Sequence, residues 1–461
     1  MFSRMGAQDV ASSEKLERYQ THKGKATNAT FSLYKEEPTM VHPASKTFTG
    51  PYFLSNLDQI VQVPIEMMMS FKGDGNKERD YEVELLKEAL QKVLVEFYPL
   101  GGRLIIGNDG KMVVVCTDEG VPFVKATSED NMEVLGDLSM IDTTKMRQLV
   151  HHIDNAHSVL DIPMITLQVT KFKCGGIILG VVMNHVLMDG EALSDFLICW
   201  SELARGSQLS IQPFLDRAIL SARQTPEIKF PHLEYSKKIR IGDLIPINSE
   251  KQLAHKSFCF TPSMISHLKK SLLEDGFIGT TPTTFQVISA LVWTLRAKAC
   301  EIKPNETTKC LIAVDSRHRL EPRMPEGFFG NGIVFSCAEC LARDLLQKPF
   351  SFAVQLIYDA IKKVTESYIR SAIDYLEVAK AGFVEVENAC YITKWSRLRY
   401  YDVNFGWGTP MQVTPTSTVE NLVVFLSQCK DSENIVISLG LPCAFMEAFN
   451  ELFCSQFNHS H

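Results

Sequence analysis

The stretch 175-GGIILGVVMNHVLMDGEALSDFLICWSELAR-205 decides the fold that we predict for this chain. Residues 177–183 form an apolar run of strand length, rich in β-branched side chains, which is typical of a buried strand. From Glu191 onward the apolar residues recur at helical spacing, which predicts a helix. His185 therefore stands where a rigid strand turns into a helix. Such a position holds an imidazole still, and Asp189 can return to hold its second nitrogen.

The HxxxD pattern alone is not specific, because His157 and Asp161 show it as well. His157 follows a polar stretch, and neither a strand before it nor a glycine after Asp161 is indicated. We therefore expect His157 to be a histidine of a surface loop. For His185 the setting favours a functional site over a core histidine bonded to backbone.

The bulk properties limit the function classes. A chain of 461 residues is long for one core, so two domains are expected. The composition is 45% hydrophobic and 22% charged with a net charge of −7, which gives no reason to expect nucleic acid or an anionic membrane as the main partner. No apolar run has transmembrane length, and residues 1–30 read as a loose polar extension. The 12 cysteines lie mostly in apolar segments, as expected of reduced thiols in a cytoplasmic protein.

Helical and strand patterns mix in both halves without a regular alternation, which predicts an α+β fold. We expect an N-terminal domain at 31–206, an irregular crossover linker at 207–255 and a C-terminal domain at 256–461. Among the individual elements, residues 31–41 are predicted to form an edge strand and residues 352–380 one long helix.

Two motifs and several shorter phrases resemble the BAHD family of plant CoA-dependent acyltransferases. His185–Gly190 matches the family's HxxxDG motif, and Asn404–Gly408 is similar to its DFGWG motif. The supporting matches, in the family's order, are Leu54–Asp58, Tyr98–Leu104, Val314–Arg317 and Phe329–Gly332. The resemblance implies a two-domain, chloramphenicol-acetyltransferase-like fold with a tunnel between the domains. It also implies a monomer that uses acyl-CoA as co-substrate and needs no metal and no permanently bound cofactor.

The same resemblance implies roles for individual residues. His185 would be the general base that takes the proton from the acceptor hydroxyl. Asp189 would be structural, pointing away from the tunnel and pairing with Arg317. Trp395 is a candidate donor to the oxyanion through its indole N–H, and the alternative is a tryptophan packed in the core.

The resemblance also implies residues that bind CoA, namely Thr284, Arg317, Trp407 and Gly408. The alternative for Thr284 is a simple helix cap, with Thr283 as the other candidate for that cap. Asn404 is a departure, because the family carries Asp at this position. An Asn keeps the shape and an acceptor oxygen but loses a charge-assisted hydrogen bond.

Three phrases look closest to relatives that pass a hydroxycinnamoyl group (feruloyl, caffeoyl or coumaroyl) to ω-hydroxy fatty acids or fatty alcohols in cutin and suberin formation. They are Tyr52–Gln59, Thr170–Gly176 and Arg370–Tyr375. Relatives acting on shikimate or quinate read that anion with an arginine, and residues 371–396 contain none. The run Met67–Met69 suits an alkyl chain or, equally, a plain core.

Three alternatives remain at this stage. One is a hydroxycinnamoyl-CoA:shikimate or quinate transferase, or another BAHD alcohol acyltransferase. The second is a protein that binds acyl-CoA without turnover, which the Asn404 departure suggests and the intact His185 opposes. The third is a carrier-dependent condensation domain, which usually has a second histidine where this chain has Asn184.

Overall fold

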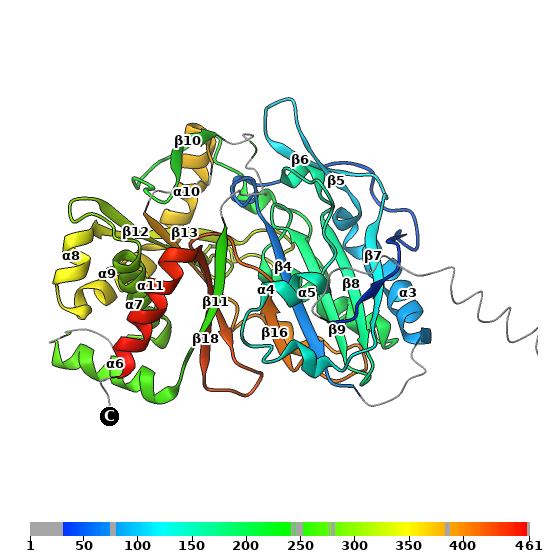
Figure 1. Cartoon of the computed structure of the whole chain (residues 1–461). Coiled ribbons are helices and arrows are strands. Elements are labelled where there is room, and N and C mark those ends of the chain that lie inside the picture. The colour runs from blue at the N-terminus through cyan, green and yellow to red at the C-terminus, as the bar shows by residue number, and fades with distance from the viewer. Residues whose placement is uncertain are drawn as a thin grey trace, which may run out of the picture.

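The computed structural model of the chain describes residues 31–73, 80–240, 252–275, 282–382 and 388–458, together with Leu244 and Phe277. The expected extension at 1–30 lies outside these residues. Two large mixed sheets stand beside each other, and helices cover each of them (Figure 1). The α+β, two-domain fold class is therefore confirmed.

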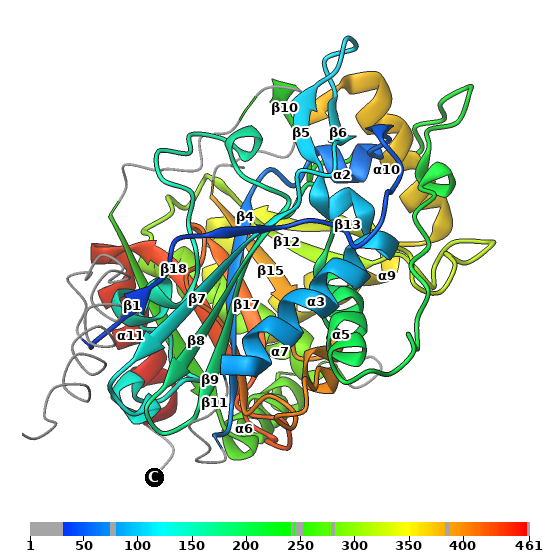
Figure 2. The same cartoon turned by 90° about the vertical axis from the view of Figure 1, so that its right-hand side faces the viewer.

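The first sheet has the strand order β1-β7-β8-β9-β4-β16, with β2 also paired to β7. Helices α3 and α5 lie side by side over one face of it (Figure 2). The expected edge strand at 31–41 is two short strands, both paired with β7. The bounds are β1 Tyr34–Lys35, β2 Thr39–Val41, β4 Pro64–Phe71, α3 Asp80–Glu96, β7 Val121–Ser128, β8 Ile165–Phe172, β9 Ile177–Asn184, α5 Gly190–Ala204 and β16 Gln412–Pro415.

The second sheet has the order β11-β18-β17-β15-β12-β13, and α6, α7, α9 and α11 pack around it (Figure 1). Its bounds are β11 Leu253–Phe260, α6 Pro262–Glu274, α7 Thr284–Ala299, β12 Thr307–Asp315, β13 Ile333–Leu341, α8 Ala342–Gln347, α9 Phe350–Lys363, β15 Ala389–Lys394, β17 Leu422–Ser427, β18 Ile435–Pro442 and α11 Cys443–Asn458.

The remaining strands form two smaller sheets. A three-stranded sheet has the order β3-β6-β5, and a pair of strands is formed by β10 and β14. The bounds are β3 Gly50–Tyr52, α2 Asn56–Gln59, β5 Arg103–Ile106, β6 Met112–Cys116, α4 Thr143–Met146, β10 Ser236–Arg240, α10 Glu366–Ala379 and β14 Ala381–Gly382.

The single long helix expected at 352–380 is wrong, because the chain forms α9 and α10 with a break between them. Thr365 adopts an extended backbone and its side chain accepts a hydrogen bond from the Tyr368 amide, so it caps a new helix. Arg319 donates to the carbonyls of Ile361 and Val364 at the end of α9, at 3.2 and 2.6 Å. The apolar period continues across the break, which is why the sequence pattern conceals it.

The last strand of the first sheet comes from the far half of the chain. β16 pairs antiparallel with β4, from Gln412 opposite Ser70 to Pro415 opposite Met67. A boundary drawn by sequence position, as at 207–255, therefore does not separate the two sheets in space. The predicted domain boundaries, 31–206, 207–255 and 256–461, therefore stay a prediction.

The methionine run on β4 belongs to the core. Met67 and Met69 are fully buried in the cluster beneath α3 and α5, and Met68 is buried in a smaller cluster on the opposite face. Successive side chains of a strand point to opposite faces of the sheet, which puts Met67 and Met69 on one face and Met68 on the other. These contacts favour the core interpretation over a methionine wall for an alkyl chain.

Among the described residues, no helix combines the length and the apolar character needed to cross a membrane.

Gly180 on β9 is a point where backbone approaches backbone. A Cβ there would lie 1.9 Å from the carbonyl oxygen of Leu149, which cannot move aside as a side chain could. We expect Gly180→Ala to lower the free energy of unfolding by about 3 kcal/mol, the upper end of overpacking costs. Urea unfolding measures this. Gly101→Ala is the control, because its Cβ would meet nothing closer than 3.6 Å. Equal stability of the two variants would contradict the close approach.

Candidate active site

The predicted strand, turn and helix around the histidine are present. β9 ends at Asn184, and Asp189 caps α5 by accepting a hydrogen bond from the Ala192 amide at 3.1 Å. The backbone N–H of His185 donates to the Val63 carbonyl at 3.1 Å. Asn184 is buried and donates to the Val159 carbonyl at 2.7 Å, so it supports the turn from beneath.

Asp189 forms a buried, bidentate ion pair with Arg317. Both oxygen–nitrogen distances are 2.8 Å, and the backbone N–H of Gly332 donates to Oδ2 at 2.8 Å as well. Burial raises the pKa of Asp189, but Arg317 more than offsets this, and the pKa is lowered overall. The pairing implied by the family resemblance is present. The other expectation, that Asp189 holds the second nitrogen of His185, is wrong because both carboxylate oxygens are occupied by other donors.

Asn331 holds the second nitrogen of His185 instead. Its Oδ1 lies 3.0 Å from Nδ1 of the imidazole. Its Nδ2 donates to Oδ1 of Asp58 at 2.8 Å and to the carbonyls of His185 and Val186 at 2.9 and 3.3 Å. Three oxygens that only accept surround Nδ2, so the amide can point only one way. Oδ1 therefore faces Nδ1, which must carry the proton, and the lone pair is left on Nε2.

The environment keeps this imidazole neutral. Burial lowers the pKa of His185 from its ordinary value of 6.5, while its own backbone carbonyl, Asp189 and Asn331 act in the opposite direction. The ring is partly exposed, and Nε2 makes no hydrogen bond to another described residue. A neutral imidazole with an available lone pair is the form that can act as a general base.

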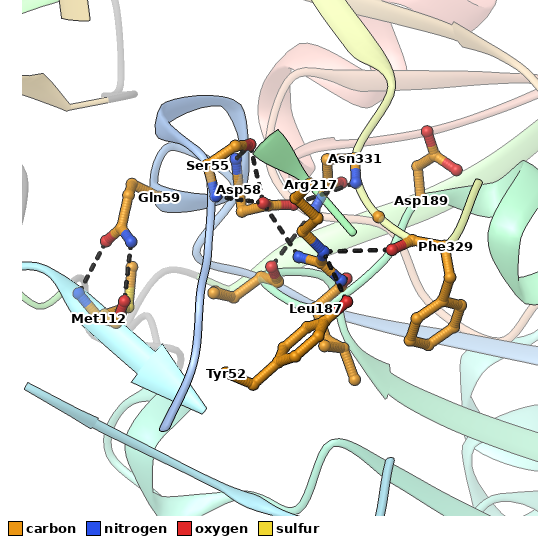
Figure 3. Close-up of polar contacts among 12 residues, drawn as sticks. Tyr52, Ser55, Asp58, Gln59, Met112, Leu187, Asp189, Arg217, Phe329 and Asn331 are labelled. Carbon is orange, nitrogen blue, oxygen red and sulfur yellow. Dashed lines mark hydrogen bonds and ion pairs between the residues drawn. The ribbon is translucent and has the colours of Figure 1, made fainter. Parts of the chain in front are cut away.

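A second buried ion pair lies beside Asn331 (Figure 3). Oδ2 of Asp58, on α2, lies 2.9 Å from Nη1 of Arg217, and both side chains are 0% exposed. Oδ1 of Asp58 accepts from the backbone and side-chain nitrogens of Asn331, at 3.0 and 2.8 Å. We did not assign roles to these three residues from the sequence. Asp58 and Asn331 stand in phrases that match the family, whereas Arg217 lies in an irregular segment without any signal.

The structure places Trp395 after β15 and Thr284 at the start of α7, without showing, among the described residues, a contact that would test the role of either residue. Trp395 follows β15, and its ring lies 6.2 Å from that of Tyr400, whose hydroxyl is close to the start of α5 at Gly190. Its indole N–H makes no hydrogen bond to another described residue. Thr283, not Thr284, caps α7, through a reciprocal pair of bonds with Gln286. The roles of Trp395 at the oxyanion and of Thr284 on the CoA side stay predictions.

Arg317 is a poor candidate for a CoA phosphate. Besides Asp189, its guanidinium donates to Asp315 at 3.1 Å and to the Gly330 carbonyl at 3.3 Å, and it is 9% exposed. Its donors are thus directed at the two turns it joins. The contacts assign it to structure, as the family resemblance also implied for the pair with Asp189.

The turn after β15 is built around Asn404. Its Oδ1 accepts from the backbone N–H groups of Gly406 and Gly408, at 2.9 and 3.2 Å. Both glycines have positive φ, +101° and +87°, a region that other residues rarely adopt. Trp407 packs edge-on against Phe71, with ring centroids 5.3 Å apart. The turn thus anchors the segment before β16, and the CoA-side assignment of Trp407 and Gly408 stays a prediction.

His157 lies in an exposed loop, as we expected. Asp161 accepts from the backbone amides of His157 and Ser158, at 2.9 and 2.8 Å, and so closes a short 3₁₀ turn. The imidazole takes no part in this turn, which makes His157 a matched control for His185.

Restoring the family's carboxylate at 404 should strengthen the glycine turn. An Asp would make charge-assisted hydrogen bonds to the same two backbone N–H groups, and such bonds are stronger than neutral ones. We expect Asn404→Asp to raise the melting temperature by about 1 °C, corresponding to roughly 1 kcal/mol in a chain of this size. Asn404→Ala should lower it. Scanning calorimetry at pH 7.5 measures both, and an unchanged Asp variant would show that the charge contributes nothing at this turn.

Fold and site together define a class of protein: a two-domain α+β fold in which contacts between distant segments fix one histidine. The sequence profile of the Transferase family matches residues 31–455. The chain belongs to this family, the BAHD family that its motifs resemble. The crystal structure of vinorine synthase superposes with a TM-score of 0.73 at 22% identity, covering 92% of this chain and 98% of that one, which shows the shared fold.

Two curated relatives from Arabidopsis thaliana are more similar in sequence. Omega-hydroxypalmitate O-feruloyl transferase is 42% identical over 434 residues, covering 93% of this chain and 94% of the relative. Fatty alcohol:caffeoyl-CoA acyltransferase is 38% identical over 419 residues, covering 90% of this chain and 96% of the relative. The phrases from which we predicted this branch of the family are therefore confirmed as a guide to relationship.

Proposed function

We propose that this enzyme transfers a hydroxycinnamoyl group from CoA to the hydroxyl of a long-chain ω-hydroxy fatty acid or fatty alcohol, with His185 as general base. The observation that carries the proposal is the state of the imidazole. Its Nδ1 is fixed by Asn331 at 3.0 Å, which leaves the lone pair on Nε2. The names of the two Arabidopsis relatives support the choice of donor and acceptor.

The chemistry follows from that lone pair. Nε2 of His185 takes the proton of the acceptor hydroxyl while the oxygen attacks the thioester carbonyl. The tetrahedral oxyanion collapses, the C–S bond breaks, and the CoA thiolate recovers the proton from the imidazolium. Asn331 accepts from Nδ1–H throughout, and it stabilises the imidazolium more than the neutral ring. Trp395 is the candidate that would donate to the oxyanion.

The evidence for a long-chain acceptor comes from the sequence more than from the residues around the active site. The core position of Met67–Met69 removes one argument for an alkyl chain. The lack of an arginine in residues 371–396 still disfavours shikimate and quinate. Because Asp189 and Arg317 are paired and His185 is fixed, a protein that merely binds acyl-CoA is the weaker alternative.

A thiol-release assay tests the proposal. Purified protein is given feruloyl-, caffeoyl- or acetyl-CoA together with 16-hydroxyhexadecanoic acid, hexadecanol or shikimate, and the ester is verified by mass spectrometry. We expect release only with a hydroxycinnamoyl-CoA and a long-chain hydroxyl. His185→Ala should lower the rate by about 10²–10⁴-fold, the usual contribution of a general base. His157→Ala, the exposed copy of the motif, should leave it unchanged.

Each other outcome has a definite meaning. Release with shikimate would move the enzyme to the alternative substrate class. Equal loss in the two histidine variants would remove His185 from the chemistry. Saturable binding of acyl-CoA without any ester product would replace catalysis by binding.

The pH dependence of the rate follows from the lowered pKa of His185. The neutral form is the base, so kcat/KM should rise with pH through the pKa of the free enzyme and then level off. Because burial holds that pKa below 6.5, the midpoint of the rise should lie below pH 6.5. Initial rates between pH 4.5 and 8.5 measure it. A midpoint above pH 7 would contradict a desolvated imidazole as the group that titrates.

We also propose a cytoplasmic monomer. All 12 cysteines are free thiols, which supports a reducing compartment. The family resemblance supports the monomer. Sedimentation velocity tests the oligomeric state, and a fluorescent fusion in plant cells tests the location.

A further inference from the structure

The buried pair of Asp58 and Arg217 contacts both turns that place the catalytic imidazole and its partner Asn331. Arg217 donates to the carbonyl of Leu187 at 2.6 Å, in the turn that follows His185, and to the carbonyl of Phe329 at 3.1 Å, two residues before Asn331. Its guanidinium also lies over the ring of Tyr52, 4.9 Å from the centroid. One side chain of the crossover segment therefore ties the two turns that carry the base and its partner.

Asp58 supplies the only charged acceptor among the three that orient the Asn331 amide. Its Oδ2 faces three donors: the backbone N–H and the hydroxyl of Ser55, both at 2.7 Å, and the guanidinium of Arg217. Its Oδ1 is left for the two nitrogens of Asn331. Of the acceptors around the Asn331 amide nitrogen, only Asp58 is charged, and charged acceptors make the stronger hydrogen bonds.

From this chain of contacts we infer that Asp58 and Arg217 are positioning residues that set the tautomer of His185 through Asn331. The carboxylate fixes the amide, the amide oxygen fixes the proton on Nδ1, and the lone pair is thereby fixed on Nε2. Arg217 forms the ion pair with this carboxylate and holds both turns in register. The inference rests on the proposed function of His185 as base, and it assigns to the pair an effect on rate rather than on stability alone.

Asp58→Asn is the decisive variant, because it changes one oxygen for an NH₂ group. The remaining oxygen of the new side chain is needed where three donors meet, at Ser55 and Arg217. The NH₂ group then opposes both nitrogens of Asn331, of which only the side-chain one can turn away. We expect this repulsion to favour a turned Asn331 amide against the carbonyls of His185 and Val186, which still accept from the original orientation. A turned amide presents its own NH₂ to Nδ1 of His185 and drives the proton to Nε2, where the base is lost.

We expect Asp58→Asn to lower kcat/KM by about 10²–10⁴-fold, the size of effect that a wrong tautomer has in a serine protease. The KM for acyl-CoA should change less than about threefold. The ring-¹⁵N spectrum of histidine-labelled protein should show the His185 proton moving from Nδ1 to Nε2, with His185→Ala used to assign the signals. Any residual activity should have its acidic limb at lower pH, because the charge of Asp58 raises the pKa of His185.

Asp374→Asn is the matched control. Asp374 is 1% exposed and holds another arginine of the same crossover segment, Arg223, at 2.7 Å. It makes no contact with the His185 network among the described residues. This variant should lose comparable stability while keeping the Nδ1–H tautomer and the pH limb of the wild type.

A second variant keeps the test decisive if Asp58→Asn folds poorly. In Asp58→Asn/Asn331→Asp the carboxylate moves one position toward the histidine, so the net charge around Arg217 is conserved. One oxygen of the new carboxylate accepts from Nδ1–H, which restores the working tautomer. The other accepts from the NH₂ group of the new Asn but also faces the carbonyl oxygens of His185 and Val186, which limits the recovery. We expect a partial recovery of kcat and an acidic limb at higher pH than in the wild type, because a carboxylate in contact raises the pKa of an imidazole.

The outcomes separate the inference from the function on which it rests. A wild-type enzyme without ester-forming activity defeats the proposed function, whatever the tautomer. An active wild type together with an Asp58→Asn variant that keeps Nδ1–H, and loses no more rate than Asp374→Asn, overturns the inference alone. Failure of the double variant to regain Nδ1–H also counts against it.

Discussion

The structure of the site depends on a buried charge pair, Asp58 with Arg217, whose side chains are both 0% exposed. Removing two charges from water is expensive, and losing one partner leaves the other uncompensated, at a typical cost of about 3–5 kcal/mol. The pair persists because its remaining groups are occupied by Ser55, Asn331 and the carbonyls of two turns. The turns that bear the base and its partner are consequently held against one side chain.

A second buried ion pair, Asp189 with Arg317, has a different structural role. Asp189 and Arg317 join the N-terminal end of α5 to the turn after β12, so they connect the two sheets. The aspartate at once caps a helix, receives the Gly332 amide and neutralises an arginine. No oxygen remains for the imidazole. The motif's aspartate therefore shapes the place of the histidine, while Asp58, distant in sequence, acts on the ring itself through Asn331.

Local patterns predicted the local parts of this structure well. The strand and helix on either side of His185 lie close to the predicted bounds. Motif order predicted the family and the two-domain α+β fold. The pairing of Asp189 with Arg317 came from the resemblance, because nothing in the spacing of residues 128 apart indicates it.

What the sequence did not predict depends on long-range contacts. β16 joins the first sheet across more than three hundred residues, and the helix at 352–380 breaks at a cap. The sequence left the place of the β4 methionines open, and the contacts put them in the core. Asn331 reaches His185 over 146 residues and Asp58 over 273. Arg217 is one of several arginines in an irregular segment, and only the folded chain distinguishes it from Arg223, which holds α10 through Asp374.

The central claim is that Asp58 acts on the base by way of Asn331. A double-mutant cycle on kcat/KM tests it most directly, with Asp58→Asn, Asn331→Ala and the combination assayed on folded protein. If the route runs through Asn331, Asp58→Asn should cost less than about threefold once Asn331 is already Ala, although it costs at least about 10²-fold alone. Strictly additive losses would contradict the account, because they would mean that Asp58 affects the rate independently of the residue that holds His185.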